Sequence, residues 1–137
     1  MEENELVICL ESILDYGDIY LDQSKVDKNY DILCYLRDYK LAPEVGHKLG
    51  HFLQVKDERV RFAAAEALTE QQDATYIDLL QPFVFDESSD NIRIRKMVIQ
   101  TMIGQKWQLK PAPTVQPGPL LENIVITKDY HLSTVPA

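Results

Sequence analysis

The chain has 137 residues, of which 45% are hydrophobic and 26% are charged, with a formal net charge of −8. These values are typical of one soluble globular domain and exclude a chain that is disordered throughout. No apolar run is long enough to span a membrane. The acidic start, MEENELVICLE, lacks the basic region of a signal or transit peptide, so we expect a cytoplasmic protein.

The negative charge is concentrated at one end of the chain. Residues 1–45 hold 11 acidic and 4 basic residues. Such a segment repels nucleic acid and suits a basic protein partner, although a solvated surface that keeps the protein soluble also explains it. The two cysteines, Cys9 and Cys34, lie among apolar residues outside any CxxC pair, which predicts buried, reduced thiols.

Apolar residues recur at helical spacing through residues 1–108 and predict six helices. The expected ranges are about 6–14 with a stop by Gly17, then about 27–40, 43–53, 58–69, 74–85 and 91–103. Nothing in residues 1–108 alternates as a strand does. The sequence therefore predicts an all-α domain over residues 1–108.

The composition changes at Lys110, where KPAPTVQPGP places four prolines in ten residues. No helix tolerates this density, so residues 109–119 are expected to be a proline-rich linker. Residues 120–137 form a tail in which Ile124–Thr127 is β-prone, predicting one short strand or an extended docked segment.

The last helix has apolar residues on two sides and needs cover on both. One stripe holds Ile94, Met97, Val98 and Met102, and the other holds Ile92, Ile99 and Ile103. We expect the tail to dock on this helix, with Trp107 as a plug beneath it. The alternative is a homodimer formed through the last helix if the tail is not docked.

An internal repeat relates two of the expected helices. VRFAAAEAL, Val60–Leu68, aligns with IRIRKMVIQTM at an offset of 34 residues. On the first copy Val60, Ala63, Ala64, Ala67 and Leu68 share one helical stripe, and the alanines let neighbouring helix axes approach closely. The stretch DERVRFAAAEAL, from Asp57 to Leu68, resembles the second-helix signature D-x-x-V-R-x-x-A-A-x-A-L of the HEAT-repeat family, in particular the short repeats of phycobilisome-lyase-like HEAT proteins. The second copy is degenerate, with Asn91 in place of Asp57 and Met97 and Val98 in place of the alanines.

The resemblance implies an α–α superhelix of about three helical hairpins in a right-handed stack, which would make the fold all-α with an extended tail. It further implies a non-catalytic scaffold or adaptor, or a subunit of a larger complex, that binds another protein and needs no cofactor. Asp57, Arg61 and Arg95 are then a structural ladder, and the i, i+4 spacing of Asp57 and Arg61 permits them to pair. The candidate contact residues lie on the second helices of the hairpins and in the tyrosine-rich first 45 residues: Arg59, Phe62, Glu66, Arg93, Lys96, Tyr35 and Tyr39.

Two alternatives remain open. One, implied by the resemblance, is a bilin-lyase-like or chaperone-like protein that acts on a chromophore-binding partner. The other is a metal site at His47 and His51, which are i, i+4 on the third helix, with His131 as a third ligand if the tail folds back. The basic run RIRK, Arg93–Lys96, is too small on so acidic a chain to indicate nucleic-acid binding.

Overall fold

The computed structural model describes residues 23–135, which fall into two compact units that meet between Gln71 and Gln72. The expected helix over residues 6–14, and with it Cys9, lies outside the described residues. None of the helices among the described residues is both long and apolar enough to cross a membrane.

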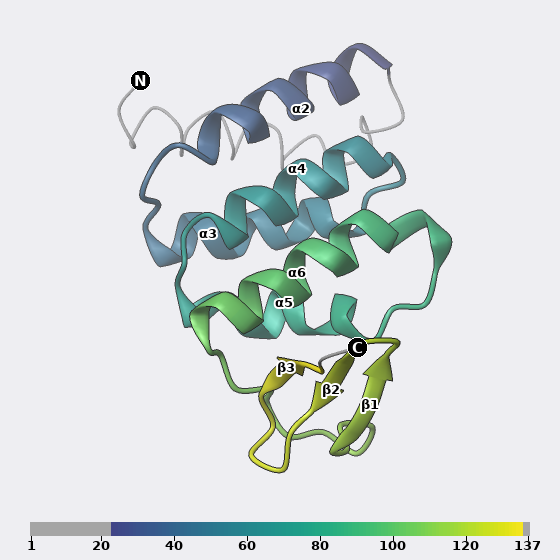
Figure 1. Cartoon of the computed structure of the whole chain (residues 1–137). Coiled ribbons are helices and arrows are strands. Elements are labelled where there is room, and N and C mark those ends of the chain that lie inside the picture. Colours follow the sequence, from purple (N-terminus) through teal and green to yellow (C-terminus); the bar gives the residue numbers. More distant parts are fainter. Residues whose placement is uncertain (1–22, 136–137) are drawn as a thin grey trace. The chain divides into compact units, whose positions relative to one another are not determined.

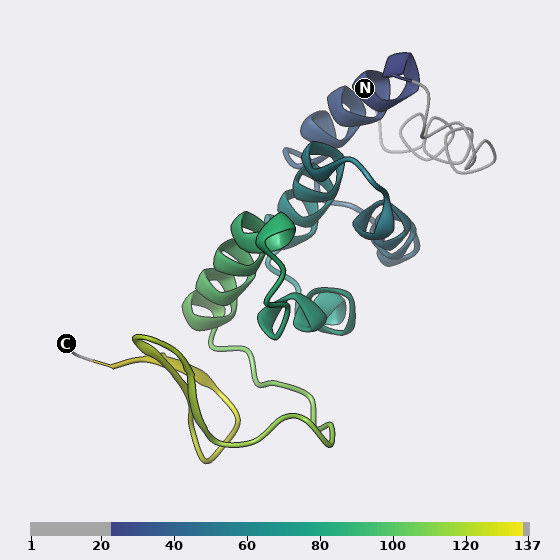
Figure 2. The ribbon, with the colours of Figure 1, turned by 90° about the vertical axis from the view of Figure 1, so that its right-hand side faces the viewer.

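The described part of the first unit, residues 23–71, contains three α-helices (Figure 1). Helix α2 spans Gln23–Leu36, α3 spans Pro43–Leu49 and continues as the 3₁₀ helix η2, Gly50–Gln54, and α4 spans Glu58–Thr69. Figure 2 shows α2 and α4 side by side, with the α3–η2 segment beside α4. The range of α4 coincides with the predicted one because Asp57 marks its start: its side chain accepts hydrogen bonds from the backbone N–H groups of Arg59 and Val60, as an N-cap does.

The core of the first unit is built around the small side chains of α4. Ala63, Ala64, Ala65 and Ala67 are each at most 1% exposed. Ala65 lies outside the stripe expected from the sequence, so α4 is buried over more of its circumference than one apolar stripe requires. Because alanine adds little bulk, α2 packs closely on α4 and contributes buried Leu33 and Leu36.

The second unit begins with two helices, each preceded by a short 3₁₀ turn. These turns are η3, Ala74–Tyr76, and η4, Ser89–Asn91, and the helices are α5, Ile77–Val84, and α6, Ile92–Gln105. Helix α6 ends one residue beyond Gly104, the expected stop. Lys106 adopts a left-handed conformation with φ of 57°, and the Trp107 amide donates to the Met102 carbonyl oxygen at 3.0 Å, as in a Schellman cap.

The rest of the second unit corrects the expected fold class: the chain is mixed α/β, and the all-α prediction is wrong. A three-stranded antiparallel sheet has the order β1–β2–β3, with β1 at Gly118–Leu121, β2 at Ile124–Ile126 and β3 at Leu132–Thr134. Ile126 pairs with Leu132 and Ile124 with Thr134. Only β2 corresponds to the β-prone run that the sequence singled out.

The sequence did not predict this sheet because its strands are short and contain residues that are unusual in strands. Pro119 lies in β1, where a proline is tolerated because β1 is an edge strand that pairs only with β2. Gly118 has a φ of +136°, which favours glycine, and it allows the strand to start directly after Pro117. Strands of three or four residues are too short to show a clear alternation in the sequence.

The sheet contacts the last helix of its own unit. Strand β3 lies against α6, and Trp107 and Leu109, between helix and sheet in the sequence, are buried. On α6, Ile94, Val98, Ile99 and Met102 are buried, whereas Met97 and Ile103 are half-buried and Ile92 is 51% exposed. The tail therefore covers part of this helix, as expected, and the homodimer stays a prediction that nothing in a single chain tests.

Candidate functional site

Three of the candidate contact residues lie on one edge of α4, where Arg59 is exposed and Phe62 and Glu66 are half-buried. Arg59, Phe62 and Glu66 are spaced i, i+3, i+7, which places them on one helical stripe. Their neighbours Val60, Ala63 and Ala67 are buried, so this stripe lies at the border between the core and the solvent. The three residues therefore share one stripe of α4, and their role as a contact surface stays a prediction.

Ion pairs join this edge of α4 to α2. The Arg59 guanidinium lies 3.3 Å from an Asp27 carboxylate oxygen, and the Arg37 guanidinium donates to Glu66 at 2.9 Å. Because Asp27 and Arg59 are near the starts of their helices and Arg37 and Glu66 are near the ends, α2 and α4 run parallel. We call the surface formed by Asp27, Tyr30, Cys34, Arg37, Arg59 and Glu66 the α2–α4 seam.

Two further residues of α2 complete the seam. The Arg59 guanidinium carbon lies 5.8 Å from the centre of the Tyr30 ring, within range of a cation–π contact. The hydrogen bond between the side chains of Tyr30 and Cys34 raises the pKa of the Tyr30 hydroxyl, and the nearby Glu66 carboxylate acts in the same direction. Cys34 is a free, half-buried thiol, whereas the sequence predicted a buried one.

Asp57, Arg61 and Arg95, the residues of the expected ladder, each make hydrogen bonds near the start of a helix. Burial alone would raise the pKa of the Asp57 carboxyl, but hydrogen bonds from the Arg59 side chain and from backbone amides outweigh it and lower this pKa. Arg61 donates to the carbonyl oxygens of Val55 and Lys56 at 2.9 and 2.7 Å.

In the second unit, Arg95 donates to the Val84 carbonyl oxygen at 2.9 Å. Each arginine thus holds its helix to the segment that precedes it through hydrogen bonds to backbone carbonyl oxygens. These bonds give both arginines a structural role.

Tyr35, on another side of α2, pairs with Tyr39, which lies in the turn after the helix. Tyr35 lies about 140° around the helix axis from Tyr30, counting 100° per residue. The two rings are 5.1 Å apart between centres, and the Tyr39 hydroxyl donates to the Tyr35 hydroxyl at 2.7 Å. This hydrogen bond lowers the pKa of Tyr35 and raises that of Tyr39.

The remaining candidate contact residues, Arg93 and Lys96, lie on α6 in the second unit, and both are exposed. They share a helix with Arg95 but do not belong to the seam. The structure therefore gathers Arg59, Phe62 and Glu66 on one edge, pairs Tyr35 with Tyr39, and leaves Arg93 and Lys96 on a separate element.

The histidine pair proposed as a metal site is separated by a change of helix type. His47 lies in the last turn of α3, and its Nδ1 is 2.8 Å from the Pro43 carbonyl oxygen. His51 lies in η2 and packs edge-on against Phe52. A 3₁₀ helix turns about 120° per residue, so the two side chains diverge more than they would on one α-helix. Among the described residues, no group of three or more His, Cys, Asp or Glu side chains is placed to hold a metal ion.

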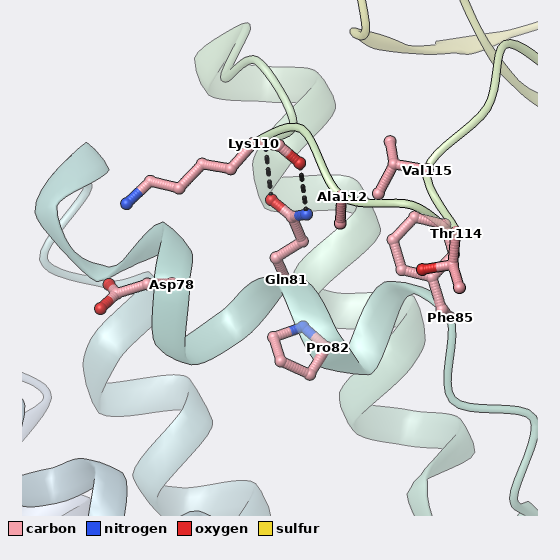
Figure 3. A pocket seen from close by; sticks show the side chains of 8 residues that line it. All are labelled: Asp78, Gln81, Pro82, Phe85, Lys110, Ala112, Thr114 and Val115. Atoms are coloured by element: carbon pink, nitrogen blue, oxygen red, sulfur yellow. Dashed lines mark hydrogen bonds between the residues drawn. The ribbon is translucent and has the colours of Figure 1, made fainter.

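A pocket of about 340 Å³ lies in the second unit, between α5 and the proline-rich segment (Figure 3). Gln81 fixes the proline-rich segment to α5 on one side of this pocket. Its amide nitrogen donates to the Lys110 carbonyl oxygen at 3.0 Å, and its amide oxygen accepts from the Lys110 N–H at 2.8 Å. The lining is mainly apolar, and its two charged residues are Asp78 and Lys110. The pocket is lined by Asp78, Gln81, Pro82, Phe85, Lys110, Ala112, Thr114 and Val115. Residues 110–115 are thus anchored on α5, although the sequence predicted a linker there.

Comparison with known proteins gives no family assignment. No family model, no curated protein and no solved structure matches the chain. The HEAT-repeat resemblance therefore stays a prediction.

Sequence reasoning missed two glutamines that fix segments of the chain. In the first unit, Gln71 is 6% exposed and bonds the backbone of Tyr39 and Leu41, and in the second unit Gln81 bonds that of Lys110. In both cases the side-chain amide donates to a backbone carbonyl oxygen and accepts from a backbone N–H, as the backbone of a neighbouring strand would do. A glutamine carries no positional signal for this role in the sequence, so nothing in the sequence distinguished these two.

Proposed function

We propose that the chain is a non-catalytic protein-binding module, an adaptor or a subunit of a larger complex, that presents the surface of α2 and α4 to its partner. The observation that carries the proposal is the α2–α4 seam, where charged and aromatic side chains are held in place before any partner arrives. Arg37 is fixed by Glu66, and Arg59 is fixed by Asp27 and the Tyr30 ring.

Such preordering favours binding. Association costs free energy for every side chain that must be immobilised, and a side chain already held by a neighbour costs less. Arginine and tyrosine are also the residues most enriched among those that dominate protein interfaces. The seam therefore has both the composition and the rigidity of a contact surface.

The arrangement of the helices supports the same proposal. Helices α2 and α4 run parallel with α3 between them in the sequence, as two stacked helical hairpins would place them. Proteins built from stacked hairpins use such extended surfaces for binding. This is the relationship that the resemblance to HEAT repeats implies.

Affinity capture with matched variants tests the proposal. The tagged chain is expressed in cells of the organism that encodes it, as wild type, as the double variant Arg59→Ala/Glu66→Ala, and as Gln105→Ala, which changes an exposed residue of α6 in the second unit. We expect a partner in stoichiometric amount with wild type and with Gln105→Ala, and at least tenfold less with the double variant.

The fold of the double variant is checked by far-UV circular dichroism. Exposed ion pairs contribute about 1 kcal/mol or less each, so the variant should stay folded. A partner that the folded double variant retains undiminished, or the absence of any stoichiometric partner, contradicts the proposal.

A further inference from the structure

We propose that a second surface, made by Asp31 and Tyr35 of α2 and by Asp38 and Tyr39 of the turn that follows it, binds a lysine- or arginine-containing segment of the partner protein. We call this surface the tyrosine stripe. The inference rests on the proposed protein-binding function and adds to it the chemical class of the partner.

The geometry of the stripe combines aromatic faces with carboxylates. Asp31 and Tyr35 are spaced i, i+4 and lie on one face of α2, and Asp38 and Tyr39 follow in the turn just after the helix, which ends at Leu36. The Tyr35 and Tyr39 rings are 5.1 Å apart and tilted by 33°, and their hydroxyls are hydrogen-bonded. The pair therefore forms one continuous aromatic surface, and Tyr35 remains 43% exposed.

The carboxylates of the stripe are available to a partner, unlike those of the α2–α4 seam. On the seam, Asp27 is engaged by Arg59 and Glu66 by Arg37, at 3.3 and 2.9 Å. On the stripe, Asp31 is exposed and makes no hydrogen bond or ion pair with the described residues. The Asp38 side chain is 75% exposed and lies 3.9 Å from Arg37, at the limit of an ion pair.

These features fit a cation rather than an anion or a neutral group. The face of an aromatic ring attracts a lysine ammonium or an arginine guanidinium, and a carboxylate one helical turn away adds Coulomb attraction. Asp31 and Asp38 are the carboxylates beside the two rings, and both are exposed, so they attract a basic segment to the stripe. The same carboxylates repel an acidic segment.

The test uses the full chain and a defined probe peptide. The ¹⁵N-labelled protein is titrated with acetyl-(Gly-Lys)₄-amide and, as a control, with acetyl-(Gly-Glu)₄-amide, and amide shifts are followed by NMR. We expect saturable shifts at Asp31, Tyr35 and Tyr39 with the lysine peptide, in the millimolar range of dissociation constant or tighter, that weaken with added salt. The glutamate peptide should leave these amides unchanged.

Variants separate the aromatic contribution from general acidity. Tyr35→Ala/Tyr39→Ala should weaken lysine-peptide binding about tenfold, because both ring faces are lost. Tyr35→Phe/Tyr39→Phe keeps the faces and should bind within about threefold of wild type. Asp31→Asn should weaken binding severalfold, whereas Glu87→Gln, the same change of charge at an exposed residue of the second unit, should not.

The outcomes separate this inference from the proposed function. Lysine-peptide shifts that spread over all acidic residues, or that persist in Tyr35→Ala/Tyr39→Ala, overturn the stripe as a basic-segment site. If Asp31→Asn and Glu87→Gln act equally, the inference also fails. If the captured partner depends on the seam but binds equally well to the stripe variants, the inference fails while the proposed function stands. If the lysine peptide binds the stripe but no partner is captured, the proposed function fails instead.

Discussion

Replacing Gln71 with alanine should destabilise the first unit by about 2–3 kcal/mol, because buried backbone groups lose their partner. The Gln71 amide oxygen accepts from the Leu41 N–H at 2.9 Å, and its amide nitrogen donates to the carbonyl oxygens of Tyr39 at 2.7 Å and Ala67 at 3.3 Å. Leu41 is 4% exposed, so water cannot readily replace this acceptor. An unpaired buried donor costs about 1–3 kcal/mol, and the less buried Tyr39 carbonyl adds a smaller amount.

Urea unfolding followed by circular dichroism measures this loss, with Gln54→Ala as the matched control. Gln54 is exposed at the end of η2, and its truncation should change stability by less than about 0.5 kcal/mol. Hydrogen exchange gives a local readout: the Leu41 amide should exchange about 30- to 150-fold faster in Gln71→Ala, the factor that corresponds to 2–3 kcal/mol. If Gln71→Ala unfolds at the same urea concentration as Gln54→Ala, the hydrogen bonds of Gln71 contribute nothing to the free energy of unfolding and the reasoning is refuted.

Gln71→Glu adds a pH signature to the same prediction. The carboxylate keeps an acceptor for the Leu41 N–H but places a negative charge against the Tyr39 and Ala67 carbonyl oxygens. The charged form is thus disfavoured in the folded state, which raises the folded-state pKa above the unfolded one. The stability difference from wild type should therefore narrow as the pH falls from 7 to 5, and a constant difference would contradict the argument.

Three further predictions concern other parts of the chain. Hydrogen bonds from the side chains of Thr127 and His131 lower the pKa of the Asp129 carboxyl in the folded state. The stability that this carboxylate adds is therefore present above its unfolded pKa and is lost as the pH falls through the lowered folded-state pKa. Asp129→Asn should flatten the acid side of a stability–pH profile measured by thermal melting. Asp57→Ala removes the N-cap of α4 and should cost about 1 kcal/mol in urea unfolding, while Asp57→Asn should retain most of it. Deleting residues 111–137 uncovers α6 and should give a less stable, associating protein by light scattering; an equally stable monomer would show that the tail is not a cover.

The helices could be predicted from the sequence because their signals are local. The range of α4 follows from Asp57 at its start and from the helical spacing of its apolar residues, and the structure places α4 at Glu58–Thr69. The sheet could not be predicted in the same way. Its strands have three or four residues, and one contains Pro119, so alternation and propensity both fail as signals.

The candidate site likewise has a part that local sequence spacing predicts and a part that it does not. The stripe of Arg59, Phe62 and Glu66 follows from spacing on one helix, and it is present. The pairing of Arg59 with Asp27 and of Glu66 with Arg37 depends on the parallel alignment of two helices about 30 residues apart in the chain, which no local pattern encodes. The roles of Gln71 and Gln81 likewise depend on where distant backbone segments lie.

The proposed function is tested most directly by the footprint of a captured partner on the chain. Hydrogen exchange of the free chain and of its purified complex, read by mass spectrometry, compares the protection of each segment. The proposed surface predicts added protection concentrated in residues 27–39 and 59–66, over the α2–α4 seam and the tyrosine stripe. Added protection confined to residues 72–137, with residues 27–66 unchanged, would contradict it.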